Sequence, residues 1–191
     1  RAPRVVVFPK DADDVSAVVK FVHEEKSHGA DISIAARSAG TDMTGGPLTT
    51  GVVISFTEHM NHLLNVAPLR HREGREASLI EGYAYTEPGV YYRDFEKATL
   101  TKGLILPSYP ASRELAAMGG IVANNSGGER SLEYGKTEQY VEELDIVLSD
   151  GSQTTFKALT PAELAQKKQL QNLEGGIYRD LDTLLTHNAE I

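Results

Sequence analysis

Two glycine-rich segments constrain this chain more than any other feature of its sequence. The first, residues 37–46, reads Arg-Ser-Ala-Gly-Thr-Asp-Met-Thr-Gly-Gly. The second, residues 117–128, reads Ala-Met-Gly-Gly-Ile-Val-Ala-Asn-Asn-Ser-Gly-Gly. Because glycine weakens helix and strand interiors by roughly 0.5 to 1 kcal/mol, neither segment is expected to be regular structure. Small residues let a backbone approach a partner closely, so the sequence predicts that something lies against both segments.

The first segment is predicted to lie in a βαβ-like lobe. Short apolar runs at residues 5–8, 32–36 and 52–56 predict strands. Between the first two runs, Val15, Val18, Val19 and Val22 form one helical stripe, with acidic residues before it and Gly29 after it. The glycine-rich connection at residues 37–46 therefore follows a strand end.

The rest of the chain mixes strands and helices without a repeat. Residues 59–77 are polar and predict a long connection or an exposed hairpin, followed by a strand at 78–84. A helix is expected at 90–101 and a strand at 104–106. Asp150-Gly151 predicts a hairpin between strands at 144–148 and 154–156, and helices are expected from Pro161 and over 177–187.

Composition excludes several classes of function. The chain has 191 residues, a net charge of −8 and no cysteine. It lacks the basic cluster that would neutralise a phosphate backbone, which argues against a nucleic-acid partner, and disulfides and thiolate chemistry are impossible. No stretch approaches the roughly 20 apolar residues of a membrane span, so we expect no transmembrane segment and a cytoplasmic location.

Standard nucleotide motifs do not match either segment. Gly40 and Gly45 have P-loop spacing, but Gly46-Pro47 stands where that motif needs Lys-Ser/Thr, and no G-x-G-x-x-G opens a helix here. Successive N–H groups in a small-residue turn can still hold a phosphate. A plain surface turn for the first segment, and close packing of two lobes for the second, remain the alternatives.

The two segments together, followed by Tyr134-Gly135 and the run at 141–151, resemble the FAD-binding domain of the vanillyl-alcohol oxidase / PCMH superfamily. The order and spacing are most similar to the D-lactate dehydrogenase and glycolate oxidase branch. The resemblance implies an α+β, PCMH-type FAD-binding fold of two α/β lobes with FAD in the crevice between them. The predicted lobes are residues 1–57 and residues 58–191, the second carrying the C-terminal helices and ending before a substrate domain.

The resemblance also implies the residues that bind FAD. The first segment would hold the pyrophosphate, part of the second would lie along the pyrophosphate and ribityl chain, and its last residues would approach the flavin. The implied residues are Arg37, Ser38, Ala39, Gly40, Thr41, Asp42, Pro107, Ala117, Gly119, Gly120, Asn124, Gly127 and Gly128.

Two departures from the family limit what the chain is expected to do. Some relatives attach flavin through a histidine where this chain has Thr41, which implies noncovalent FAD. The family's substrate domain, with its acid/base groups, has no counterpart here, so we expect no catalytic residue and no turnover from this chain alone.

The resemblance implies that the parent protein passes hydride from a 2-hydroxy acid to flavin N5 and electrons to a separate acceptor. Alternatives are another superfamily enzyme, acting on an alcohol, a sugar or a cell-wall precursor, or a noncatalytic FAD-binding fragment.

Other polar residues have simpler explanations than chemistry. His59 and His62 have the spacing of a metal pair but no third ligand nearby, so we expect no metal site; with His71 they are expected to be solvated. Strand and helix packing accounts for Tyr83, Tyr85, Tyr91 and Tyr92, and a solvated loop accounts for Glu129, Arg130 and Glu133.

Overall fold

The computed structural model describes residues 2–69 and 81–188. The chain divides into two compact units, which are treated separately below. The first contains the residues up to Asp14 together with Asp31–Val141, and the second contains Val15–Ala30 together with the chain from Glu142 onward. The lobe boundary expected between residues 57 and 58 lies inside the first unit, so the two lobes stay a prediction.

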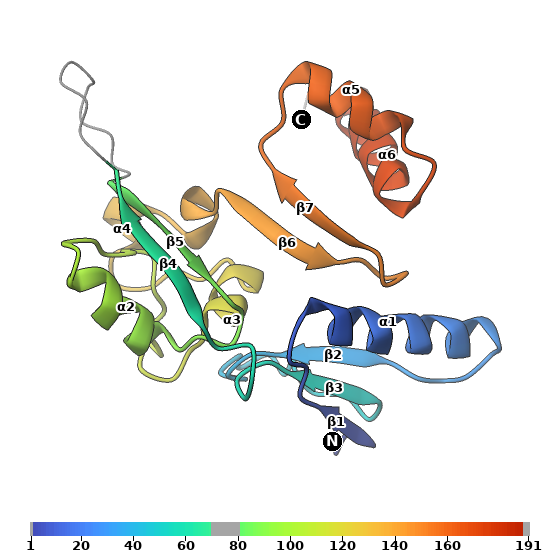
Figure 1. Cartoon of the computed structure of the whole chain (residues 1–191), viewed down its shortest axis with the longest axis horizontal. Coiled ribbons are helices and arrows are strands. Elements are labelled where there is room, and N and C mark those ends of the chain that lie inside the picture. Colours follow the sequence, from blue (N-terminus) through green and yellow to red (C-terminus); the bar gives the residue numbers. More distant parts are fainter. Residues whose placement is uncertain (1, 70–80, 189–191) are drawn as a thin grey trace. The chain divides into compact units, whose positions relative to one another are not determined.

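A three-stranded parallel sheet begins the first unit (Figure 1). Its strands are β1 (Val5–Val7), β2 (Ile34–Arg37) and β3 (Val52–Ser55), with β3 in the middle. Val53 is paired with both Val6 and Ala35. Because the strands are parallel, their carboxyl ends lie at one edge, and the first glycine-rich segment begins there at the end of β2.

The helix between β1 and β2 in the sequence is α1 (Ala12–Ser27). Its start is fixed locally, because the Asp14 N–H donates to Asp11 Oδ1 over 2.9 Å. Its end is followed by Gly29 with φ of 89°, a conformation that glycine adopts at little cost. The predicted helix and its terminal glycine are therefore confirmed.

An antiparallel hairpin follows, formed by β4 (Leu63–Pro68) and β5 (Gly82–Thr86). Its first strand lies within residues 59–77, where a long connection or an exposed hairpin was expected, and its second strand belongs to the strand expected separately at 78–84. Residues 70–80, which include the start of the strand expected at 78–84, lie outside the described residues. The described part of that strand begins at Gly82 and ends two residues later than expected.

The core of the first unit forms where this hairpin meets the following helices. The helices that contribute to this core are α2 (Tyr92–Leu100) and α3 (Met118–Ala123), and α4 (Ser131–Tyr134) and the 3-10 helix η1 (Thr137–Tyr140) follow them in the chain. Leu63, Ala84 and Leu106 pack against the buried cluster. The cluster consists of Val90, Tyr92, Phe95, Tyr109, Ala116, Met118 and Ile121.

Two expectations for this unit are wrong. Residues 104–106 do not form a strand: Leu104 packs beside Gly82, and the Leu106 carbonyl accepts a side-chain hydrogen bond from Tyr92 instead of a ladder bond. The second glycine-rich segment contains a helix, α3, in spite of its paired glycines. Burial of Met118 and Ile121, one turn apart, offsets the low helix propensity of Gly119 and Gly120.

Besides most of α1, the second unit contains the hairpin of β6 (Glu143–Val147) and β7 (Gln153–Lys157) and two further helices in its described part. The predicted turn is confirmed, with Gly151 at φ of 80°. Helix α5 (Pro161–Gln169) starts at the predicted proline, behind a capping box formed by Thr160. Helix α6 (Leu173–His187) starts four residues earlier than expected, because Asn172 Oδ1 caps the Gly175 N–H.

We predict that Tyr92→Phe destabilises the protein. The fully buried Tyr92 hydroxyl donates to the Leu106 carbonyl over 2.6 Å, and removing it leaves that carbonyl short of a partner. The free energy of unfolding, measured by urea titration, should fall by about 1 to 2 kcal/mol. Tyr83→Phe, at a side chain that is 49% exposed, is the control and should change it by less than about 0.5 kcal/mol.

Candidate functional site

A single carbonyl joins the two glycine-rich segments. The oxygen of Pro88 accepts a hydrogen bond from Ser38 Oγ over 2.7 Å and another from the Gly119 N–H over 2.9 Å. A Cβ added to Gly120 would lie 3.5 Å from the Cβ of Ser38. The structure therefore brings together two segments that are some 80 positions apart in the sequence.

The first segment offers a run of free backbone donors. Within residues 2–69 and 81–188, no oxygen accepts a hydrogen bond from the backbone N–H groups of residues 39–43. The Arg37 side chain folds back over Gly40, where an added Cβ would lie 2.5 Å from the guanidinium carbon. This guanidinium also has no hydrogen-bonding or ionic partner in the described part of the chain. Free N–H groups beside an unpaired cation are the chemistry of an anion site.

Asp42 holds the last residues of the same segment, up to Gly46, by hydrogen bonds. Its carboxylate accepts hydrogen bonds from the Thr44 hydroxyl, the Thr44 N–H and the Gly46 N–H, and these bonds lower the Asp42 pKa below its ordinary value. A group with a lowered folded-state pKa keeps its bonds above its ordinary pKa and loses them as pH falls through the lowered value. Asp42 thus shapes the loop as an anion at neutral pH.

The second segment divides into buried and accessible parts. Pro107 and Ala117 are buried, and the Gly119 N–H is already bonded to Pro88. Gly120 is exposed, and nothing in the described ranges accepts from its N–H. Only Gly120 of these four residues therefore presents a free backbone donor.

The end of the second segment lies against protein on one side. A Cβ on Gly128 would lie 2.3 Å from the Tyr109 carbonyl, and one on Gly127 would lie 2.4 Å from Ser131 Oγ. Asn124 is exposed. Close packing within the protein therefore explains Gly128, and also Gly119, whose added Cβ would meet Pro88 at 2.6 Å.

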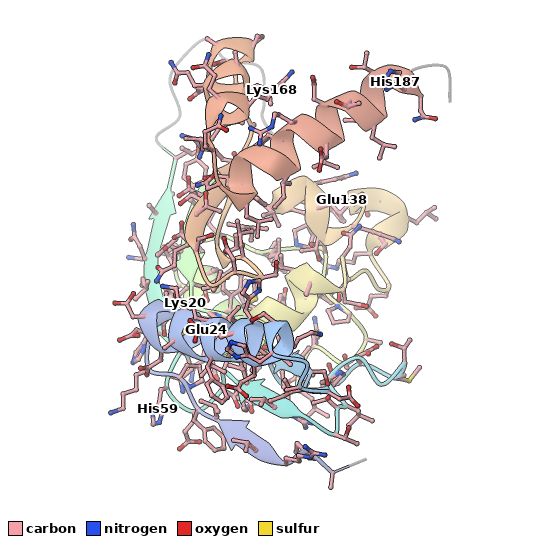
Figure 2. All side chains as sticks on the ribbon, turned by 90° about the vertical axis from the view of Figure 1, so that its right-hand side faces the viewer. Lys20, Glu24, His59, Glu138, Lys168 and His187 are labelled. Atoms are coloured by element: carbon pink, nitrogen blue, oxygen red, sulfur yellow. The ribbon has the colours of Figure 1, made fainter. Side chains whose placement is uncertain are left out.

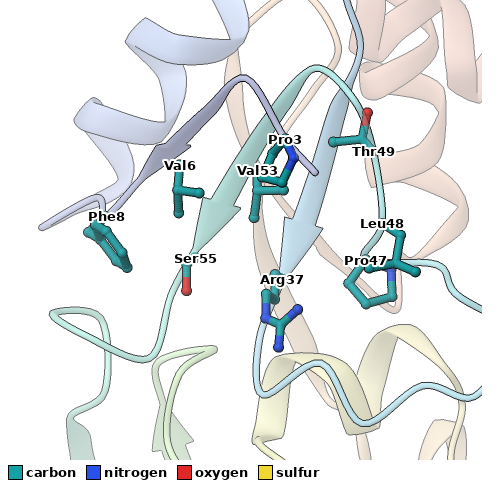
Figure 3. Close-up of a pocket in the computed structure, with 9 residues that line it drawn as sticks. All are labelled: Pro3, Val6, Phe8, Arg37, Pro47, Leu48, Thr49, Val53 and Ser55. Carbon is teal, nitrogen blue, oxygen red and sulfur yellow. The ribbon is translucent and has the colours of Figure 1, made fainter. Parts of the chain in front are cut away.

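A pocket of about 290 Å³ adjoins Arg37 on one face of the parallel sheet (Figure 3). Val6, Val53 and Ser55 line it from the strands, and Pro47 and Leu48 close it from the loop. Its lining is mainly apolar, and Arg37 provides its cationic edge. Arg37 therefore borders both the pocket and the free N–H groups of the loop.

His59, His62 and His71 lie in the sequence between the two glycine-rich segments and in neither of them. His59 is exposed, as Figure 2 shows, and the described residues hold no group of three or more potential metal ligands. His62 is exposed too, but its Nδ1 lies 2.8 Å from a Glu87 carboxylate oxygen, in the turn that presents the Pro88 carbonyl. His71 lies outside the described residues.

The tyrosines and Glu129 differ in how far the protein holds them. Tyr92 is in the core, and Tyr83 and Tyr85 are exposed on β5. Tyr91 lies under the Arg93 guanidinium. The Tyr109 hydroxyl donates to Glu129, so the residue after Gly128 is held by protein as well as solvated.

Sequence reasoning missed Pro88. The sequence Glu87-Pro88-Gly89, between the strand expected at 78–84 and the helix expected at 90–101, indicates a turn and nothing more. Gly89 leaves no space for a side chain in this turn, because an added Cβ would lie 2.2 Å from the Phe56 carbonyl. A glycine after a proline signals a tight turn, but not which groups its carbonyl will meet. The contacts to Ser38 and Gly119 span too much sequence for a local pattern to reveal.

Comparison with known families identifies the family of this chain. A family model described as FAD binding domain matches residues 3–157. The chain belongs to this FAD-binding domain family. FAD is therefore its cofactor, and the free donors and the unpaired Arg37 at the loop fit the dianionic pyrophosphate of that molecule.

Curated relatives agree with the family. The chain is 34% identical over 151 residues to the glycolate oxidase subunit GlcD of Bacillus subtilis, covering 78% of this chain and 28% of that protein. It is 35% identical to a D-lactate dehydrogenase of Archaeoglobus fulgidus, covering 77% of this chain and 29% of that protein. The chain thus spans less than a third of the length of these relatives.

Solved structures confirm the fold. The chain resembles 6-hydroxy-D-nicotine oxidase from Arthrobacter nicotinovorans with a TM-score of 0.64 and 17% identity, over 86% of this chain and 32% of that one. The predicted α+β, PCMH-type fold is therefore confirmed. Among the described residues, no helix is both long and apolar enough to cross a membrane.

We predict that Gly40→Ala weakens FAD binding about ten-fold or more, because the new Cβ displaces the Arg37 guanidinium from the loop. Gly103→Ala is a matched control. Gly103 has φ of 71° against 72° for Gly40, so backbone strain is similar, but nothing lies within 4 Å of its added Cβ. Isothermal titration with FAD should separate the two variants, and equal losses of affinity would argue against the role of Arg37.

Proposed function

We propose that the N–H groups from Ser38 to Asp42, together with Arg37, bind the pyrophosphate of FAD. The observation that carries this proposal is the unpaired guanidinium beside the run of free backbone donors. Each charge-assisted hydrogen bond is stronger than a neutral one, and an anion with several oxygens can accept several of them. The Gly120 N–H, free and adjacent to Ser38, adds a donor from the second segment.

The other end of the second segment would lie against the flavin. Gly127 and Gly128 have no side chains, which suits a flat ring system, and the exposed Asn124 lies three positions before them. Pro107 and Ala117 are buried, so in this proposal they support the cofactor-binding surface from within the core. In this proposal the implied residues act as one site, in which some contact FAD and others support the surface that it lies on. They are Arg37 to Asp42, Pro107, Ala117, Gly119, Gly120, Asn124, Gly127 and Gly128.

The attachment of FAD is proposed to be noncovalent. Thr41 is exposed in the pyrophosphate loop, and its hydroxyl lacks the nucleophilic nitrogen through which a histidine attaches flavin. Acid precipitation of the FAD-loaded protein should release all of the flavin into the supernatant, measured by absorbance and mass. Flavin that remains with the denatured polypeptide on a gel would contradict the proposal.

The complete protein is proposed to oxidise a 2-hydroxy acid. Glycolate and D-lactate, which appear in the names of the two relatives above, share a carboxylate with a hydroxyl on the adjacent carbon. Bound FAD would accept the two electrons of this oxidation and pass them to a separate acceptor. This domain would hold the cofactor, in a cytoplasmic enzyme. Bleaching of bound flavin by anaerobic glycolate or D-lactate tests the substrate class.

The pyrophosphate assignment predicts a specific effect of Arg37→Met. The change keeps the aliphatic stem and removes the charge, so affinity should fall about ten-fold for both FAD and ADP, which share the pyrophosphate. The dependence of binding on salt should also weaken. Titration calorimetry at two salt concentrations measures both effects.

Arg4→Met provides the charge control for this experiment. Arg4 is exposed just before β1, at the opposite edge of the same parallel sheet from the loop. Its loss should leave both affinities unchanged. Equal affinity of wild type and Arg37→Met for ADP would contradict the assigned pyrophosphate site.

A further inference from the structure

One residue of the second glycine-rich segment has an unusual backbone conformation. Asn125 has φ of 44°, and among the described residues it is the single non-glycine residue with positive φ. Side chains disfavour this conformation, although asparagine tolerates it better than most residues. The residue stands between Asn124 and Ser126, two positions before Gly127, so its conformation sets the direction of the chain into the pair Gly127-Gly128.

The first two residues of η1 form hydrogen bonds with Asn125 and Ser126. Asn125 Nδ2 donates to Glu138 Oε2, and the Glu138 N–H donates to Asn125 Oδ1 over 3.0 Å. Next to this pair, the Ser126 carbonyl accepts from the Thr137 N–H over 3.1 Å and from the Thr137 hydroxyl over 2.8 Å. These four residues, Asn125, Ser126, Thr137 and Glu138, are called the 125–138 clamp below.

The clamp differs in burial from one half to the other. Thr137 and Ser126 are 2% and 6% exposed, and a third hydroxyl, that of the fully buried Ser108, donates to the Thr137 oxygen over 3.4 Å. A buried carbonyl that lost the Thr137 hydroxyl would keep one donor out of two. Glu138 is exposed (Figure 2), so its pairing with Asn125 can be altered without opening the core.

We propose that Thr137 and Glu138 are positioning residues for the flavin end of the cofactor. They touch Asn125 and Ser126 and hold the backbone of residues 124–128 in the form that faces FAD. This inference rests on the proposed function, in which Asn124, Gly127 and Gly128 lie against the flavin. Release of the clamp lets Asn125 leave its positive φ and turns the glycine pair away from the ring.

The proposal predicts a split between two ligands. ADP contains the pyrophosphate but no flavin, so it reports on the Arg37 loop alone. Loss of the clamp should weaken FAD binding and leave ADP binding unchanged, whereas loss of Arg37 weakens both. A general loss of structure would lower both affinities, so the split separates positioning from stability.

Charge exchange within the exposed half of the clamp provides the test. Asn125→Asp places a carboxylate against that of Glu138, and we expect the Kd for FAD to rise about ten-fold. The double variant Asn125→Asp/Glu138→Gln restores a donor on one side and an acceptor on the other, and should recover affinity to within about three-fold of wild type. Glu133→Gln, at an exposed carboxylate of α4, is the control for loss of charge alone.

The buried half is tested by Thr137→Val and Thr137→Ser. Valine removes the hydroxyl at nearly constant volume and should weaken FAD binding, whereas serine keeps the hydroxyl and should restore it. Hydrogen exchange of the FAD-free chain, followed in peptides covering residues 121–130, gives a measurement that needs no ligand. Exchange should accelerate in Asn125→Asp and return to the wild-type rate in the double variant.

The outcomes separate the two proposals. A wild-type chain that binds ADP and FAD equally, with exchange rescued in the double variant, would show a clamp that does not serve the flavin, and would overturn the positioning role. Wild-type FAD binding without rescue in the double variant would overturn the inference and leave the proposed function standing. A wild-type chain that binds neither ligand would overturn the proposed function, and the positioning role with it.

Discussion

The arrangement of the site depends on the carbonyl of Pro88. It accepts from Ser38 at the start of the first glycine-rich segment and from Gly119 in the second, so a single oxygen fixes the distance between them. The turn that presents this oxygen is itself held: the Gly89 N–H donates to the Met60 carbonyl over 2.8 Å, and Glu87 is paired with His62. Because both segments donate to the same oxygen, a shift of either one away from Pro88 breaks its own hydrogen bond to that carbonyl and separates it from the other segment. Gly119 can approach Pro88 this closely because it has no side chain: an added Cβ would lie 2.6 Å from the Cβ of Pro88.

The first glycine-rich segment is organised by a division of its backbone donors. Asp42 takes the N–H groups of Thr44 and Gly46, and the groups of residues 39–43 have no acceptor in the described part of the chain. An ionised carboxylate inside a loop that is proposed to bind an anion is unfavourable in simple Coulomb terms. Here it is held by hydrogen bonds on the far side of the loop, which fixes the near side without consuming its donors. Arg37 adds positive charge on that near side, where it lies over Gly40.

Local patterns in the sequence predicted most of the regular elements and the two segments of the site, but not how the segments meet. The valine stripe of α1, the turn at Gly151 and the proline at the start of α5 each depend on neighbours in the sequence, and each is confirmed. Helix α3 was missed because burial of Met118 and Ile121 outweighs glycine propensity, which is a tertiary effect. The strand expected at 104–106 was wrong for the same reason, since Tyr92 takes the carbonyl that a ladder would need. Two further contacts could not be predicted from the residue types involved: the hydrogen bond from Ser38 to Pro88 and the pairing of Asn125 with Glu138.

Glycines stand in this chain for two different reasons, close packing and an open backbone, and the residue type alone does not tell them apart. Gly119 and Gly128 are required by protein atoms, because an added Cβ would meet Pro88 or the Tyr109 carbonyl below 3 Å. Gly120 has space for a side chain, with its nearest neighbour 3.5 Å away, so packing alone does not require glycine there. Its free N–H is then the stronger reason for a bare backbone, since a side chain at this exposed position would compete with a ligand for the same space. In the proposed function the packing glycines shape the surface and Gly120 is left open toward the cofactor, so the paired glycines of this segment serve the core and the site separately.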